Sequence, residues 1–275
     1  MNNFWQRAIT GTIFVVVLVG AILLGGWYMH ITFGLVVFLG LLEFYKLFEK
    51  TETQPQKWVG TIFGTAIYFL SILMYYHGKD YGIPLVGCSL VMFLVFCLIE
   101  LFKTGKRPFE SIATTLAGII YVVIPFALLN FISFSFSFIG ETYNFWPVLS
   151  IFILIWCNDT FAYLTGRLIG KHKLFERISP KKTWEGFFGG VVFALIAGIL
   201  LAYFQQESYI KFIVYASVAS VIGTLGDLVQ SMLKRSVNVK DSGTILPGHG
   251  GILDRFDAVL FVVPVIFFLE TFIFS

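Results

Sequence analysis

The sequence predicts an all-α, polytopic transmembrane protein, a bundle of about nine spans with a cytoplasmic N-terminus. The first observation is its composition: of 275 residues, 57% are hydrophobic and only 13% are charged. A soluble domain carries about 25% charged residues, so this chain has too little charge to coat a water-soluble globule. The second observation is that apolar stretches of spanning length, about 20 residues, recur along the whole chain. The third is the one-sided placement of the cations.

The apolar stretches divide the chain into nine candidate spans. Most are separated by short polar segments, and the longest of these cover residues 166–182 and 234–251. Gly25 and Gly26 leave open a short re-entrant hairpin in place of the first two spans. The predicted spans are Ala8–Leu24, Ile31–Phe48, Trp58–Tyr76, Ile83–Phe102, Ile112–Phe131, Trp146–Gly166, Trp184–Phe204, Ile210–Leu233 and Ile252–Phe274.

The cations predict the orientation. Short cytoplasmic loops of membrane proteins are enriched in Lys and Arg. With nine spans and the N-terminus inside, 17 of the 19 cations fall on the cytoplasmic side, and only Lys79 and Lys211 fall outside. One cation, Arg7, precedes the first apolar run, and no clear small-residue cleavage site follows it. We therefore expect an uncleaved first helix and an outer C-terminus.

Composition also excludes some classes of function. A net charge of only +3 gives no support for nucleic-acid binding, and three cysteines without CxxC or Cys/His spacing argue against a disulfide framework or a zinc site.

We expect residues 1–140 to form a scaffold of transmembrane helices that could provide a dimer interface. We expect residues 141–275 to carry the catalytic site and its cytoplasmic loops.

Carboxylates inside spanning helices are costly and mark functional sites by default. Asp159 precedes the boundary cation Arg167 by eight residues, roughly 12 Å along a helix, and Asp227 precedes Lys234 by seven, roughly 10 Å. Both aspartates should lie in the cytoplasmic leaflet, short of the midplane. A third carboxylate, Glu43, precedes Lys46 by three residues, and we interpret these two as a satisfied pair at the interface.

Helical spacing gathers several of these side chains on common faces. Asp227, Ser231 and Lys234 share one helix face, and Asp254 and Asp257 share another at the start of the last span. Oxygen ligands of this kind, completed by water and substrate phosphates, suit Mg²⁺. Structural alternatives stay open: Asp254 and Asp257 could complement a helix dipole, Asp227 could pair with a lysine, and Asp159 could be a buried hydrogen-bonded residue.

Two polar loops flank these carboxylates. The segment between Lys234 and Asp257 combines cations with glycines, whose backbone N–H groups can approach and bind phosphate oxygens. His249 could donate to a phosphate or cap the turn. In the other loop, Lys181 and Lys182 could form a second phosphate-binding arm or only satisfy the positive-inside rule, and Thr183 or Ser179 could cap the next helix.

The segment Ser231–Asp257 resembles the signature of the phosphatidate cytidylyltransferases, the CDP-diacylglycerol synthases. The similarity covers roughly residues 155–260, and earlier residues match only as hydrophobic spans. The matching elements are Asp159, Ala162–Tyr163, Gly166–Arg167, Gly170–Lys171, Ile178–Thr183, Glu185–Gly186, Gly226–Asp227, Ser231, Lys234–Arg235, Lys240–Asp241, Pro247, His249–Gly251, Asp254–Arg255 and Asp257.

The resemblance implies that CTP and phosphatidic acid give CDP-diacylglycerol and pyrophosphate for phospholipid synthesis in the bilayer. It also implies Mg²⁺ dependence with Asp227 and Asp254 as metal ligands, a potassium ion beside the magnesium, and a homodimer. Short loops favour a bacterial inner (cytoplasmic) cell membrane, with the active site facing the cytoplasm.

Our hypotheses group the candidate residues by role, and Asp227 and Asp254 are both catalytic residues and metal ligands. The catalytic residues are Asp227, Asp254, Asp257, Lys234 and Arg235, and the substrate-binding residues are Asp159, Arg167, Lys181, Lys182, Ser231, Lys240, His249, Gly250, Gly251 and Arg255. One rival function is a secondary transporter with intramembrane carboxylates, although the outer half of the predicted bilayer region is almost free of ionisable residues. The other is a different CDP-alcohol or polyprenyl-phosphate enzyme.

Overall fold

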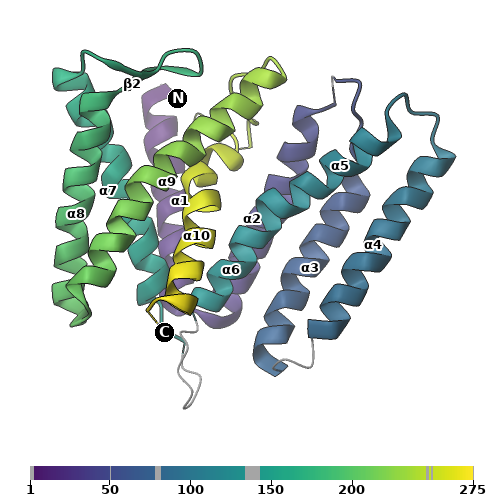
Figure 1. Ribbon diagram of the computed structural model, residues 1–275, viewed down its shortest axis with the longest axis horizontal. Coiled ribbons are helices and arrows are strands. Elements are labelled where there is room, and N and C mark those ends of the chain that lie inside the picture. The colour runs from purple at the N-terminus through teal and green to yellow at the C-terminus, as the bar shows by residue number, and fades with distance from the viewer. Residues whose placement is uncertain are drawn as a thin grey trace. The chain divides into compact units, whose positions relative to one another are not determined.

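The computed structural model describes residues 3–49, 51–77, 82–133, 143–245, 248 and 250–274. These residues form helices throughout, apart from loops and one two-stranded hairpin (Figure 1). The chain divides into two compact units. The first comprises Met1–Phe131 and Val237–Arg255, and the second comprises Ile132–Ser236 and Phe256–Ser275. The segment 237–255 therefore clusters with the N-terminal helices rather than with its neighbours in the sequence.

The first unit is a layer of long helices. Figure 1 shows α2, α3 and α4 side by side, with the α5–α6 rod crossing them. The rod is continuous, because a short π-helical stretch joins α5 to α6 just before Pro125, which lacks a backbone N–H. The elements are α1 (Asn3–Leu24), α2 (Gly26–Leu47), α3 (Lys57–His77), α4 (Gly82–Phe102), α5 (Pro108–Gly118), η2 (Ile119–Val123) and α6 (Ile124–Ser133).

Among the described residues, the second unit packs four long helices and a hairpin. Contacts between α7 and α8 and between α8 and α9 hold its core together. The hairpin lies beside the N-terminal end of α8 (Figure 1). Its elements are α7 (Trp146–Ile169), β1 (Lys173–Phe175), β2 (Ser179–Thr183), α8 (Trp184–Gln205), α9 (Tyr209–Ser236) and α10 (Leu253–Phe272), which begins in the first unit and continues here from Phe256.

Within the described residues, the helices coincide with the nine predicted spans to within a few residues, once α5, η2 and α6 are taken as one rod. Six of them are long and apolar enough to cross a membrane, and α1 and α3 contain shorter apolar windows. The last helix, α10, carries four charged residues. The prediction of an all-α polytopic protein is confirmed, whereas the hairpin between α7 and α8 was not predicted.

The start of the chain forms two separate helices. α1 and α2 each contain 22 residues, and only Gly25 separates them. Gly25 and Gly26 have φ angles of 66° and 49°, a conformation that residues with a Cβ atom rarely adopt. The glycine pair is therefore the break between two full-length helices rather than the tip of a short re-entrant hairpin.

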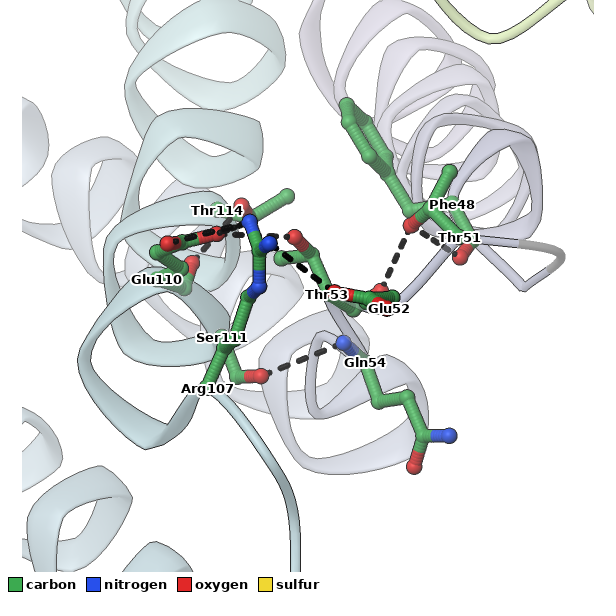
Figure 2. A network of polar contacts seen from close by, with 9 residues as sticks. All are labelled: Phe48, Thr51, Glu52, Thr53, Gln54, Arg107, Glu110, Ser111 and Thr114. Atoms are coloured by element: carbon green, nitrogen blue, oxygen red, sulfur yellow. Dashed lines mark hydrogen bonds and ion pairs between the residues drawn. The ribbon is translucent and has the colours of Figure 1, made fainter.

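Polar contacts join two loops at one end of the first unit (Figure 2). Arg107 lies 2.9 Å from Glu52 and 3.1 Å from Glu110, so one guanidinium group links the α2–α3 loop to the start of α5. The Gln54 backbone N–H donates to the Ser111 hydroxyl at 3.1 Å. All three ionised side chains are about half exposed, so we expect these ion pairs to orient the loops more than to stabilise the fold.

An ion pair also lies at the opposite end of α9 from Asp227. Lys211 contacts Glu270 of α10 at 2.8 Å, and the Tyr215 hydroxyl donates to the same carboxylate. Both charged side chains are mostly buried, with exposed fractions of 18% and 12%. Because the two charges compensate each other within the protein, this pair does not indicate the ion path that a secondary transporter would need.

Small residues let the helices of the second unit approach closely, as is common in membrane bundles. A Cβ atom at Gly198 of α8 would lie 2.8 Å from the Phe212 carbonyl oxygen of α9. By contrast, a Cβ atom at Gly20 of α1 would meet no atom within 4 Å.

These two glycines give a matched pair for testing the packing. We expect Gly198→Ala to lower the stability by about 1–3 kcal/mol, because the added methyl group overpacks the interface. Gly20→Ala should instead be neutral or stabilising by about 1 kcal/mol, the usual gain from removing a glycine in a helix. The apparent unfolding temperature in detergent measures both. An equal response of the two variants would contradict the α8–α9 packing.

Candidate active site

Asp227 of α9 forms the centre of a polar cluster in the second unit. Its Oδ2 atom lies 2.6 Å from the Lys182 Nζ atom, and its Oδ1 atom accepts a hydrogen bond from Ser231 at 3.3 Å. The predicted shared face of Asp227 and Ser231 is therefore confirmed. The lysine partner also exists, and it is Lys182 from the hairpin. The exposed fractions, 35% for Asp227 and 28% for Lys182, leave the pair accessible to water and solutes.

α10 brings a second carboxylate to this cluster. A Cβ atom at Gly226 would lie 2.9 Å from the Asp257 carbonyl oxygen, so the backbones of α9 and α10 are very close at this level. The glycine before Asp227 thus permits the two aspartate-bearing segments to come together. The Asp257 and Asp227 side chains interact electrostatically as a result. Asp257 Oδ1 also accepts the backbone N–H of Ala258 at 2.8 Å.

Asp159 of α7 completes the group of carboxylates. It interacts electrostatically with Asp227, Asp257 and Lys182, and its Oδ1 atom accepts from the amide of Asn158 at 3.3 Å. Asp159 has exposed surface and also accepts a hydrogen bond from Asn158, so the structural alternative for this residue stays open. Three carboxylates and one lysine from four elements therefore share one region of the second unit.

The cluster is not a closed metal cage. Among the described residues, no group of three or more His, Cys, Asp or Glu side chains has the arrangement of a complete metal site. Mg²⁺ does not need one, because it is commonly held by one or two carboxylates, with water and substrate phosphates as its other ligands. Partly exposed oxygen donors on Asp227 and Asp257 suit that mode of binding.

The hairpin that supplies Lys182 is fixed at its base. Thr183 accepts a hydrogen bond from the Gly186 backbone N–H at 3.2 Å and so caps α8, as one of the two sequence interpretations predicted. The Glu185 carboxylate accepts the backbone N–H groups of Lys171 and His172 at 3.0 and 3.2 Å. These contacts join the segment that follows α7 to the first turn of α8.

A bulge in the hairpin carries the two lysines. Phe175 pairs with Ser179 and Lys173 with Thr183, so one residue of β1 faces three residues of β2, Pro180 to Lys182. Bulges redirect side chains and accommodate proline within a strand. Lys182 pairs with Asp227, whereas Lys181 is exposed. The two adjacent lysines therefore have different surroundings.

The glycine-rich segment belongs to the first unit, where Asp254 organises it. Asp254 Oδ2 accepts backbone hydrogen bonds from Ser242 at 2.9 Å and from Gly251 at 3.2 Å. Gly250 between them has a φ angle of 87°, which requires glycine. Asp254 therefore does more than complement the dipole of α10, because it also folds the loop that precedes the helix.

The remaining candidates fall into both units. Arg167, Lys181, Ser231, Lys234 and Arg235 belong to the second unit, and Lys240, Gly250, Gly251 and Arg255 belong to the first. Lys240, Arg235, Arg255 and Arg167 are exposed, and Lys234 and Arg235 lie in the last turn of α9, where cations complement the helix dipole. His249 and Pro247 lie outside the described residues.

Comparison with known proteins decides the family. Residues 5–273 match the model of the cytidylyltransferase family. The chain belongs to this family. It is 33% identical to a phosphatidate cytidylyltransferase of Bacillus subtilis, with 98% of each chain covered. It is 35% identical to one of Staphylococcus aureus, covering 94% of this chain and 96% of the relative, and 32% identical to one of Synechocystis, covering 96% and 95%.

Membership of the cytidylyltransferase family confirms the resemblance found in the sequence, and it extends that resemblance to the N-terminal helices. These helices contribute a residue that sequence reasoning misinterpreted. Glu43 of α2 is 2% exposed and accepts hydrogen bonds from Ser242 and from the Leu253 backbone N–H. Within the described part of the chain it has no ion pair with Lys46, so that predicted pair is wrong. Its intramembrane position was the signal that could have identified it.

The role of Asp254 in the loop can be tested by limited proteolysis. In Asp254→Ala the Ser242 and Gly251 N–H groups lose their acceptor, so trypsin should cleave after the exposed Lys240 several-fold faster. Asp254→Asn retains a carbonyl acceptor and should be cleaved at the wild-type rate. Mass spectrometry identifies the cut, and cleavage after Arg177 in the hairpin provides the internal control. Equal protection of Lys240 in both variants would contradict the role of Asp254.

Proposed function

We propose that this protein is a CTP:phosphatidate cytidylyltransferase, which makes CDP-diacylglycerol and pyrophosphate. The observation that carries the proposal is the full-length similarity to three phosphatidate cytidylyltransferases. The cluster of Asp227, Asp257 and Lys182 at one end of long apolar helices supports it further. A nucleotide in water and a phospholipid in the bilayer can both reach groups at that level.

The reaction makes few demands for proton transfer. A phosphate oxygen of phosphatidate, already anionic, attacks the α-phosphorus of CTP, and the bond to the bridging oxygen of the β-phosphate breaks. Pyrophosphate leaves with the bonding electrons, so no strong general base is required. Phosphoryl and nucleotidyl transfers of this type are accelerated mainly by positioning the reactants and neutralising their charge.

The cations of the chain fit this requirement. We propose that Ser231, Lys234, Arg235 and Lys240 bind phosphate oxygens, and that Arg167, Lys181 and Lys182 hold the triphosphate or the lipid headgroup. Backbone N–H groups around Gly250 and Gly251, with Arg255 and His249 nearby in the sequence, would add further donors. Lys182 pairs with Asp227 and so would carry its charge close to the reacting phosphates.

A divalent cation fits the carboxylates of the second unit. We propose that Asp227 and Asp257 hold Mg²⁺, with Asp159 orienting a ligand. The ion would neutralise negative charge on the triphosphate and the departing pyrophosphate. Asp254 as a second metal ligand, the potassium ion and the homodimer stay predictions from the family resemblance. The Asp254 side chain already accepts two backbone N–H groups through one oxygen.

The cation distribution supports an orientation. We propose that the N-terminus, the hairpin and the glycine-rich segment face the cytoplasm of a bacterial cell, because 17 of the 19 Lys and Arg residues then lie inside. The active site would face the compartment that supplies CTP.

The activity can be tested with the purified protein. Labelled CTP, phosphatidic acid and Mg²⁺ should give CDP-diacylglycerol and pyrophosphate, and chelation of the metal should stop the reaction.

Asp227→Asn should lower turnover by about 100-fold or more, because a neutral amide cannot compensate the metal and Lys182. Its unfolding temperature should stay close to that of the wild type. Near-wild-type turnover in this variant would refute the assigned role of Asp227, and substrate-dependent flux in proteoliposomes without product would favour a transporter.

The orientation can be tested by labelling single cysteines. In a variant with Cys88, Cys97 and Cys157 replaced by serine, we expect Glu207→Cys to react with a membrane-impermeant maleimide on intact spheroplasts. Arg177→Cys should react only after permeabilisation. Both positions are exposed in the second unit, so accessibility within the protein does not separate them. The opposite labelling pattern would reverse the proposed orientation.

A further inference from the structure

Glu43 is a buried carboxylate in the first unit, at the end of α2 that precedes the α2–α3 loop. Its side chain is 2% exposed. Burying an ionised carboxylate is costly unless it accepts hydrogen bonds or is paired with a cation. The groups that donate hydrogen bonds to the Glu43 carboxylate therefore indicate its role in the structure.

The Glu43 side chain accepts hydrogen bonds from one distant segment, residues 242–253. Its Oε2 atom accepts the Leu253 backbone N–H at 3.0 Å and the Ser242 hydroxyl at 3.2 Å. Leu253 is the first residue of α10, where helical N–H groups lack a partner within the helix. A side chain that lies 210 residues from Leu253 and 199 residues from Ser242 in the sequence thus caps α10 and holds Ser242.

Two glycines of the same segment leave room for this carboxylate. A Cβ atom at Gly243 would lie 2.4 Å from Glu43 Oε1, and one at Gly251 would lie 2.4 Å from Oε2. Any larger residue would therefore displace either the loop or the carboxylate. The glycines at these two positions thus have a steric role.

Ser242 joins Glu43 to Asp254. The Ser242 hydroxyl donates to Glu43, and its backbone N–H donates to Asp254. Leu253, held by Glu43, directly precedes Asp254 in the chain. The direction of Asp254 and the path of the loop after Lys240 therefore depend on Glu43.

We propose that Glu43 is a positioning residue of the active site, which holds the segment from Lys240 to Asp254 in its binding conformation. The proposal rests on the proposed function, because that segment carries the groups assigned to phosphates. Glu43 does not touch the substrates itself. It acts through the Ser242 hydroxyl and the first N–H group of α10.

A purely structural role predicts a different kinetic result. If Glu43 only stabilised the fold, its replacement would reduce the number of active molecules and lower kcat, while the KM for CTP of the remaining molecules stayed the same. A misplaced phosphate-binding loop raises that KM in every molecule. The change in KM therefore separates positioning from stability.

The matched control is Glu100, a second buried carboxylate of the first unit. It is 5% exposed and accepts hydrogen bonds from Gln56 and Lys103. Neither of these partners belongs to the segment 237–255. Glu100→Ala thus removes a carboxylate of similar burial and leaves the glycine-rich loop in place.

The first experiment compares Glu43→Ala, Glu43→Gln and Glu100→Ala. We expect Glu43→Ala to raise the KM for CTP roughly tenfold, the effect of losing one hydrogen bond to a charged group. It should also speed trypsin cleavage after Lys240. Glu43→Gln keeps a carbonyl acceptor and should recover most of the wild-type KM, whereas Glu100→Ala should leave the KM unchanged. A KM in Glu43→Ala equal to that of Glu100→Ala would overturn the proposal.

The second experiment is a double-mutant cycle. Gly243→Ala should raise the KM for CTP in the wild-type background, because its new methyl group meets the Glu43 carboxylate. In the Glu43→Ala background the same change should have little further effect, since the carboxylate is gone. Strictly additive effects would overturn the contact between Gly243 and Glu43.

The two experiments also separate this inference from the proposed function. If the wild-type protein and Glu100→Ala made no CDP-diacylglycerol, the proposed function would fail. Protection of Lys240 from trypsin would still report whether Glu43 holds the loop. If both proteins were active and Glu43→Ala left both the KM and the proteolysis unchanged, only the positioning role of Glu43 would fail.

Discussion

Compensation of charge near the ends of apolar helices is the constraint on which this structure depends. Carboxylates in the predicted spans need donors, and for several of them the chain supplies donors from outside the helix that carries them. Lys182 of the hairpin serves Asp227, Ser242 and the start of α10 serve Glu43, and Lys211 serves Glu270. Loops that look like simple connections in the sequence are therefore fixed by these side chains.

Close helix packing is the second requirement for these contacts. Gly226 allows the backbone of α10 to approach α9 where Asp227 and Asp257 lie. In the first unit, Gly243 and Gly251 play the same part around Glu43. A carboxylate can be compensated by backbone N–H groups only if the backbone comes within hydrogen-bond distance, and a side chain at these positions would prevent that.

The helices could be predicted because the bilayer sets their length, and apolar runs of about 20 residues show this length directly. The face shared by Asp227 and Ser231 followed from helical spacing. Contacts between distant segments could not be predicted in this way. Glu43 is separated from Ser242 by 199 residues, while Lys46 is a plausible partner only three residues away. The hairpin was missed because its strands contain three and five residues and lie in a polar loop.

The bulge in this hairpin separates two tasks along one short strand. The paired ends, Lys173 with Thr183 and Phe175 with Ser179, together with the cap on α8, hold the hairpin in place. The register shift lies between these two pairs, in the stretch of β2 that carries Lys182 to Asp227. The number of residues in the bulge thus sets the position of the Lys182 ammonium group. Inserting or deleting a residue between Ser179 and Thr183 would therefore move Lys182 relative to Asp227.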